Sequence, residues 1–145
     1  MKTIIITGAS GSGKSYLSNK LSRTFYNSII IRTDSYYRDN LLIRLLSNLF
    51  YDIYDRPLSI KRKELNNTIR SIYNKDKKIS HYTYDFKRKH SSKSKITLNY
   101  NREIQYLILE GIFSHRLDLN YKGAINIICE EDKDICFKRR LKRDK

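Results

Sequence analysis

Residues 1–15 read MKTIIITGASGSGKS, and this stretch decides the fold. The β-branched run from Thr3 to Thr7 ends in glycines, which predicts a fully buried strand of a parallel sheet. A helix is expected to begin directly after the glycines, because Leu17, Leu21 and Phe25 follow at helical spacing and form one apolar face. A buried strand, a glycine loop and an amphipathic helix together indicate the first half of a βαβ unit.

Apolar patterns further along the chain extend this unit into a domain. We expect more buried strands at Ser28–Ile31, Tyr106–Leu109 and Ala124–Cys129. Helices are expected at Leu41–Phe50, over Leu65, Ile69 and Ile72, and after Asp132, which can act as a cap. Alternation of Tyr82, Tyr84 and Phe86, and then of Ile96, Leu98 and Tyr100, predicts a β-hairpin with a charged tip through Lys87 to Lys95.

The length of 145 residues suits one domain. The sequence therefore predicts a single domain over residues 1–145. Its expected fold class is α/β: a doubly wound parallel sheet with about four strands, helices on both faces and a β-hairpin insertion.

Composition narrows the partners only partly. The chain has 30 Lys and Arg against 15 Asp and Glu, and the resulting charge of +15 attracts polyanions such as nucleotides, RNA or an acidic membrane surface. Frequent Lys, Asn, Ile and Tyr also fit AT-rich coding DNA, so the charge does not select among these partners. Nucleic acid is therefore a candidate partner but not the favoured one, and the sequence carries no signal for an oligomeric state.

Cysteine spacing and hydropathy indicate a location. Cys129 and Cys136 lack the spacing of a zinc site or a disulfide framework, which favours a reducing compartment. No apolar run reaches membrane-spanning length, and the opening residues lack a signal-peptide cleavage region. We expect a soluble protein without a membrane partner, in the cytoplasm or in an organelle interior such as the plastid stroma.

The glycine loop carries the chemistry. Gly8-Ala9-Ser10-Gly11-Ser12-Gly13-Lys14-Ser15 matches G-x-x-x-x-G-K-[ST] between a predicted strand and a predicted helix. Its backbone N–H groups and the helix N-terminus can surround phosphate oxygens, with Lys14 reaching the β and γ phosphates and the Ser15 hydroxyl ligating Mg²⁺. The loop predicts a nucleoside triphosphate and Mg²⁺ as ligands, and it makes the expected doubly wound sheet one of the P-loop NTPase type.

Two carboxylates are expected at the same edge of the sheet, where the carboxyl ends of parallel strands line the ligand crevice. Asp34 follows the second strand, and it can accept the proton of an attacking hydroxyl, hold the metal or simply cap a helix. Glu110 ends the third strand, where it suits the metal shell or is an ordinary loop carboxylate.

Six ordered segments resemble the uridine kinase and phosphoribulokinase family, and more closely its uridine–cytidine kinase branch. They are GASGSGKS, Asp34-Ser35-Tyr36-Tyr37-Arg38, Tyr54-Asp55-Arg56-Pro57, Tyr84-Asp85-Phe86 followed by His90, Leu109-Glu110-Gly111-Ile112, and Arg139-Arg140-Leu141-Lys142-Arg143-Asp144. The chain departs from the family pattern in three ways. His90 follows Tyr84 by six residues where the family has five, Tyr54 and Arg56 replace Phe and His, and the chain stops at Lys145, where the family continues with more lid arginines, a strand and a helix.

The resemblance implies that residues 1–145 form a single P-loop kinase domain, with ATP and Mg²⁺ as cofactors. The implied reaction is ATP-dependent phosphorylation of uridine or cytidine at the 5′-hydroxyl. By this resemblance Asp34 is the general base and acts with Lys14, and Asp55 holds the ribose hydroxyls. The pyrimidine is then surrounded by Tyr54, Tyr84 and His90, and the transferring phosphate is clamped by Arg140 and Arg143.

Two alternatives remain open at this point. The acceptor is a sugar phosphate or another small alcohol in the first, although the stacking surfaces of Tyr54 and Tyr84 suit a base better. In the second, the chain is a catalytically silent remnant that binds nucleotide or RNA, as its charge of +15 would favour.

Overall fold

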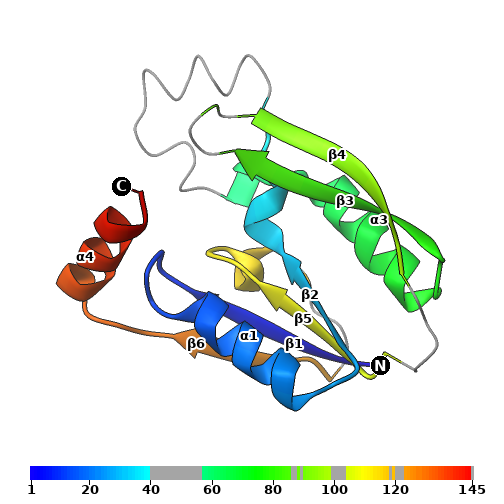
Figure 1. The fold of residues 1–145 in the computed structure, drawn as a ribbon, viewed down its shortest axis with the longest axis horizontal. Coiled ribbons are helices and arrows are strands. Elements are labelled where there is room, and N and C mark those ends of the chain that lie inside the picture. Colours follow the sequence, from blue (N-terminus) through cyan, green and yellow to red (C-terminus); the bar gives the residue numbers. More distant parts are fainter. Residues whose placement is uncertain are drawn as a thin grey trace. The chain divides into compact units, whose positions relative to one another are not determined.

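A computed structural model of the chain describes residues 1–39, 57–85, 88, 90–98, 104–117, 119 and 123–144, without the side chains of 143 and 144. The chain divides into two compact units (Figure 1). Unit 1 joins residues 1–32 to residues 104–145, and unit 2 contains the intervening residues 33–103. The expectation of a single domain stays a prediction.

Unit 1 is built on a four-stranded parallel sheet with the order β2-β5-β1-β6. Its strands are β1 (Lys2–Gly8), β2 (Ser28–Arg32), β5 (Tyr106–Glu110) and β6 (Ile125–Cys129). All four lie where the sequence predicted strands, with ends within one residue. The expected burial is wrong for β6, which lies at the edge of the sheet and has Ile125 and Ile128 exposed. The predicted α/β class with a parallel sheet is confirmed.

Helix α1 (Lys14–Thr24) covers one face of this sheet, and Figure 1 shows it in front of β1. The buried side chains of Ile4, Ile6 and Ile108 form a core on that face, against which Leu17, Leu21 and Phe25 pack. The helical spacing of those three residues explains the contact, since it gathers them on one side of α1. Each fully buried aliphatic side chain stabilises the fold by about 1.5–3 kcal/mol.

The C-terminal part of unit 1 adds the short 3-10 helix η4 (Ser114–Arg116) and helix α4 (Lys133–Asp144). Asp132 caps α4 as predicted, because its Oδ1 accepts hydrogen bonds from the N–H groups of Asp134 at 2.8 Å and Ile135 at 3.3 Å. In the part of the chain that the structure describes, no helix is long and apolar enough to cross a membrane.

Unit 2 contains the helical segments η1 (Thr33–Tyr36), η3 (Pro57–Ser59) and α3 (Arg62–Tyr73), and the antiparallel hairpin of β3 (Lys78–Asp85) and β4 (His90–Thr97). The predicted amphipathic helix is confirmed, because Leu65, Ile69 and Ile72 are buried on α3. Figure 1 shows the hairpin running beside that helix. The helix expected at 41–50 lies outside the described residues.

The hairpin corrects one expectation. A charged tip was expected through Lys87 to Lys95, but Asp85 pairs directly with His90, so the stretch from His90 to Lys95 belongs to strand β4. This stretch is rich in Ser and Lys, and nothing in its own composition favours a strand. Pairing with β3 makes it one.

Candidate functional site

The glycine loop connects β1 to α1, as its motif predicts. Gly11 has φ +91°, in the left-handed region, and a Cβ there would lie 2.5 Å from the carbonyl oxygen of Cys136 on α4. Gly8 has φ +150°, and a Cβ there would collide with the carbonyl oxygen of Cys129 at the end of β6. Both positions therefore require glycine, because the loop must curl tightly while other backbone segments approach it.

The inside of the loop presents positive charge and unused polar groups. Lys14 is only 7% exposed, and its Nζ donates a hydrogen bond to the carbonyl of Ala9 at 2.8 Å. Helix α1 begins after Gly13, which has no side chain to cap it, and its first turn holds no acidic residue. The Ser12 hydroxyl is buried without a hydrogen-bond partner in the described part of the chain. A helix N-terminus without a side-chain cap, a lysine and a buried serine hydroxyl form a set that can bind phosphate oxygens.

The two residues predicted to hold the metal are brought together. Parallel pairing sets Glu110 beside Ile6 of β1, and the Ser15 hydroxyl donates a hydrogen bond to Glu110 Oε1 at 3.2 Å. Arg32 Nε lies 3.4 Å from the same oxygen, although the Arg32 side chain is largely exposed. The other oxygen, Oε2, is buried without a hydrogen-bond partner among the described residues. A buried carboxylate oxygen beside a hydroxyl fits Mg²⁺, which takes oxygen ligands and usually only one or two carboxylates.

Cys129 ends β6 next to the loop, with its thiol partly exposed. Burial is the main influence and raises the pKa of this thiol, the charge of Glu110 adds to the rise, and the positive charge of Lys14 opposes it. A raised pKa keeps the thiol protonated and weakly nucleophilic. Cys129 packs against the buried cluster of Ile4, Ile6 and Ile108.

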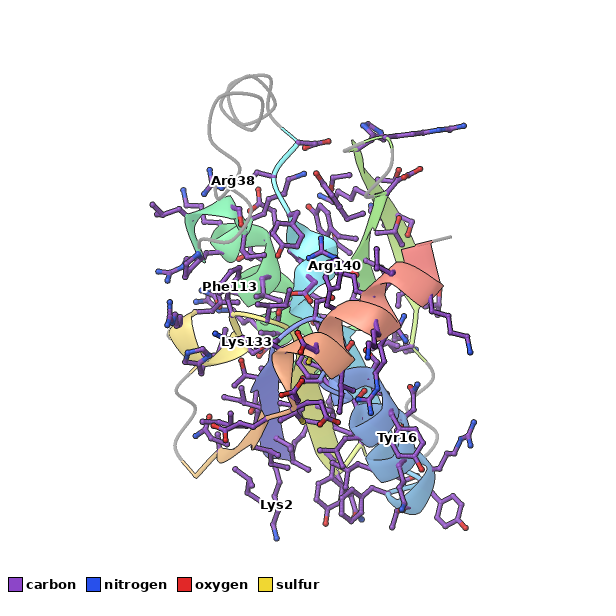
Figure 2. The ribbon with its side chains drawn as sticks, turned by 90° about the vertical axis from the view of Figure 1, so that its left-hand side faces the viewer. Lys2, Tyr16, Arg38, Phe113, Lys133 and Arg140 are labelled. Atoms are coloured by element: carbon purple, nitrogen blue, oxygen red, sulfur yellow. The ribbon has the colours of Figure 1, made fainter. Side chains whose placement is uncertain are left out.

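Helix α4 reaches the glycine loop through a residue that sequence reasoning missed. Arg139 Nη1 donates a hydrogen bond to the Gly11 carbonyl at 3.1 Å and pairs with Glu131 at 3.1 Å. Arg140 is exposed on the same helix, and Figure 2 shows it further along α4 than Lys133. The side chain of Arg143 lies outside the described part. No local pattern distinguished Arg139 from its basic neighbours.

Asp34, the predicted general base, lies in unit 2 on η1, which directly follows β2 in the chain. It is half-buried, between the buried Thr33 and Tyr36. The Tyr36 hydroxyl donates a hydrogen bond to Thr68 on α3 at 3.0 Å, and burial raises the pKa of Tyr36 to about 12. This bond, with the one that the Tyr36 carbonyl accepts from the Lys61 N–H at 2.7 Å, anchors η1 on the C-terminal side of the carboxylate.

Tyr84 and His90, which the resemblance places around the base, leave the hairpin on opposite faces. Tyr84 pairs with Ser91 and His90 pairs with Asp85, and neighbouring pairs of a ladder alternate between the two faces. The Tyr84 ring lies 5.4 Å from the ring of Tyr37, which follows η1. The structure therefore does not bring Tyr84 and His90 together, and the role of His90 stays a prediction.

Asp39 is a second residue that sequence reasoning missed. Its carboxylate accepts a hydrogen bond from Lys61 Nζ at 2.9 Å and one from the Ser91 N–H at 3.0 Å, and His90 Nδ1 lies 3.6 Å from its Oδ2. Burial alone would raise the pKa of Asp39, but the hydrogen bonds from Lys61 and Ser91 outweigh it and the pKa is lowered. Asp39 thus fastens the start of β4 to the segment after η1. Tyr54 and Asp55, predicted to hold base and ribose, lie outside the described residues.

Each unit thus gathers its own set of candidate residues. Unit 1 holds the glycine loop with Lys14, the pair of Ser15 and Glu110, and the arginines of α4. Unit 2 holds Asp34 and Tyr84. The first set suits a triphosphate with its metal, and the second offers a carboxylate and an aromatic surface.

Comparison with known proteins gives consistent matches. A family model described as "Phosphoribulokinase / Uridine kinase family" matches residues 3–145. A uridine kinase of Ureaplasma parvum is 32% identical over 145 aligned residues, covering 97% of this chain and 68% of that enzyme.

Two solved structures share the fold. One, described as "a Possible Uridine Kinase from Bacillus stearothermophilus", has a TM-score of 0.61 at 17% identity and covers 98% of this chain and 77% of that one. A D-glycerate 3-kinase from Cryptococcus neoformans has a TM-score of 0.53 at 17% identity, and covers 77% of this chain and 42% of that one.

Proposed function

The chain belongs to the phosphoribulokinase / uridine kinase family, and from this premise we propose that it transfers the γ-phosphate of ATP to the 5′-hydroxyl of uridine or cytidine. Membership of this family makes it a phosphotransferase. The observation that best supports binding of ATP with Mg²⁺ is the hydrogen bond from Ser15 to the buried Glu110 beside the glycine loop. The pyrimidine nucleoside is proposed because relatives named uridine kinase match 97% of the chain.

On the donor side, the loop from Gly8 to Ser15 would bind the phosphates through its N–H groups, with Lys14 on the β and γ phosphates. Ser15 and Glu110 would hold Mg²⁺, which when bound supplies positive charge to the phosphate oxygens. Arg140 and Arg143 on α4 would add positive charge at the transferring group. Phosphoryl transfer depends on alignment and positive charge more than on covalent chemistry, and this residue set matches that need.

On the acceptor side, Asp34 would take the proton of the 5′-hydroxyl as that oxygen attacks the γ-phosphorus and ADP leaves. Its place on the anchored η1 supports this role, because a general base must be held within hydrogen-bond reach of its proton. Tyr84 would stack on the base, and Tyr54 and Asp55 would contact base and ribose. The reaction would take place in the cytoplasm or an organelle interior, where ATP and Mg²⁺ are abundant.

Asp34→Asn tests the proposal, because it keeps the size of the side chain and removes its ability to take a proton. We expect ATP to bind within a few-fold of the parent, and turnover of uridine and cytidine to fall about 100-fold. Asp76→Asn, which alters an exposed carboxylate after α3, is the matched control and should behave as the parent does. Equal turnover and equal uridine binding in the Asp34→Asn variant and the parent would discard Asp34 as the base.

A different acceptor is the second candidate, since the family name includes phosphoribulokinase and a D-glycerate 3-kinase shares the fold. An acceptor screen with ATP and Mg²⁺ separates the two. Turnover of ribulose 5-phosphate or glycerate without turnover of pyrimidine nucleosides would reverse the order of the two candidates.

A further inference from the structure

One face of the hairpin is turned toward η1, the segment that carries Asp34. The Tyr82 ring lies 4.9 Å from that of Tyr36, and the Tyr84 ring lies 5.4 Å from that of Tyr37. Tyr82 and Tyr84 are two residues apart on β3, so they share a face. This face, called the η1 face below, is therefore the one on which an acceptor near Asp34 would meet the hairpin.

Ser91 lies on the η1 face, because it is the cross-strand partner of Tyr84. Its hydroxyl is buried and has no hydrogen-bond partner within the described ranges of the chain. Buried hydroxyls in folded proteins are nearly always hydrogen-bonded, and leaving one unsatisfied is unfavourable. Ser91 is thus an unused hydrogen-bonding group directly opposite the tyrosine proposed to stack on the base.

The backbone of Ser91 is held firmly although its hydroxyl is not. The Ser91 N–H donates to Asp39 Oδ2 at 3.0 Å, and Asp39 is in turn held by Lys61 at 2.9 Å. The segment before Asp39 is fastened as well, because the Arg38 N–H donates to the Ser59 carbonyl at 2.7 Å. A side chain on so constrained a backbone can present its hydroxyl in a defined position.

His90 is in a different situation. It pairs with Asp85 on the face opposite the η1 face, and its side chain is 64% exposed beside Asp39. A shift of one residue along a strand moves a side chain to the other face. The extra residue between Tyr84 and His90, relative to the family pattern, therefore takes the histidine away from the face that bears Tyr84.

We propose that Ser91 is the residue whose hydroxyl hydrogen-bonds the base of the acceptor nucleoside, with Asp39 positioning it. This inference rests on the proposed function. A hydroxyl both donates and accepts, and it can rotate to meet the carbonyl and ring N–H of uracil or the amino group and ring nitrogen of cytosine. Ser91 would therefore hold either pyrimidine without discriminating between them.

The experiment compares Ser91→Ala with Ser92→Ala, in which the next hydroxyl, exposed on the opposite face, is removed. For Ser91→Ala we expect kcat/KM for uridine and for cytidine to fall about three- to tenfold, the loss of one hydrogen bond. The KM for ATP should not change, and Tm should not fall, because no bond of the folded protein is broken. Ser92→Ala should match the parent in all of these.

These measurements can contradict the proposed role of Ser91 in three ways. Parent values of kcat/KM in Ser91→Ala, or a fall in Tm with an equal loss toward ATP, would overturn the role of Ser91. A larger acceptor effect from His90→Ala than from Ser91→Ala would also overturn it. A parent chain that neither binds nor phosphorylates pyrimidine nucleosides would remove the proposed function and this inference together, whereas an active parent with an unaffected Ser91→Ala removes only the inference.

Discussion

Replacing Glu110 with Gln should weaken binding of ATP with Mg²⁺ and leave the metal-free fold almost unchanged. The amide keeps an oxygen for the Ser15 hydroxyl, which donates at 3.2 Å, but it loses the charge that would hold the metal. A hydrogen bond or contact to a charged group contributes about 1.5–3 kcal/mol, so the affinity should fall about 10- to 100-fold. The ion pair with Arg32, whose side chain is 59% exposed, contributes at most about 1 kcal/mol to stability.

Two measurements separate these effects. Calorimetric titration with ATP at a series of Mg²⁺ concentrations gives the metal-dependent affinity, and thermal unfolding in EDTA gives the metal-free stability. Glu130→Gln is the matched control, since Glu130 is exposed two residues before the α4 cap and should titrate as the parent does. A Glu110→Gln variant with the parent's Mg²⁺ dependence would refute the metal role of the buried carboxylate.

Substitutions at Gly11, Asp39 and Lys14 test three further contacts of the two units. Gly11→Ala should cost about 1–3 kcal/mol of stability, seen as a lower Tm, because its Cβ would lie 2.5 Å from the Cys136 carbonyl oxygen at φ +91°; a parent-like Tm would contradict the packing of α4 on the loop. Burial alone would raise the pKa of Asp39, but its hydrogen bonds, first the one from Lys61, outweigh burial and lower the pKa from 3.8. The ionised Asp39 therefore stabilises the folded protein above pH 3.8, and this stabilisation is lost as the pH falls through the lowered pKa. In urea unfolding measured between pH 7 and acid pH, the free energy of unfolding should therefore fall more steeply for the parent than for Asp39→Asn. Parallel curves for the two proteins would exclude this role of Asp39. Lys14→Ala should bind ATP at least about tenfold more weakly by calorimetry while staying folded, and unchanged affinity would remove the phosphate role of the loop.

The strands and the donor side of the site could be read from sequence because local patterns determine them. Runs such as Thr3–Thr7 are β-branched at every position and contain no charge, which is typical of a strand covered on both faces. The motif spacing placed Lys14 and Ser15 at the start of a helix. Since parallel strands end at one edge of their sheet, the end of β5 could be expected to bring Glu110 to the loop, and in the structure Glu110 accepts a hydrogen bond from Ser15.

The contacts that sequence reasoning missed join residues far apart in the chain. Arg139 donates to the carbonyl of Gly11, and nothing in either neighbourhood encodes that bond. The hydrogen bond from the Ser91 N–H to Asp39 likewise has no local signal in the sequence. The register of the hairpin was also hidden, because β4 is a strand through pairing with β3 and not through its own composition.

The place of β1 at the centre of the sheet has a consequence for the order of folding. Both of its partners come from late in the chain, since β5 begins at Tyr106 and β6 at Ile125. Contacts of such long sequence separation form slowly, because a large loop must close before they contribute. The continuous unit 2 can gain structure earlier in synthesis, whereas the strand that carries the glycine loop gains its first neighbour only after residue 110 has been made and its second only after residue 129. Binding of ATP to the glycine loop can therefore stabilise the protein only after β5 and β6 have been made, and it cannot assist the earlier folding of unit 2.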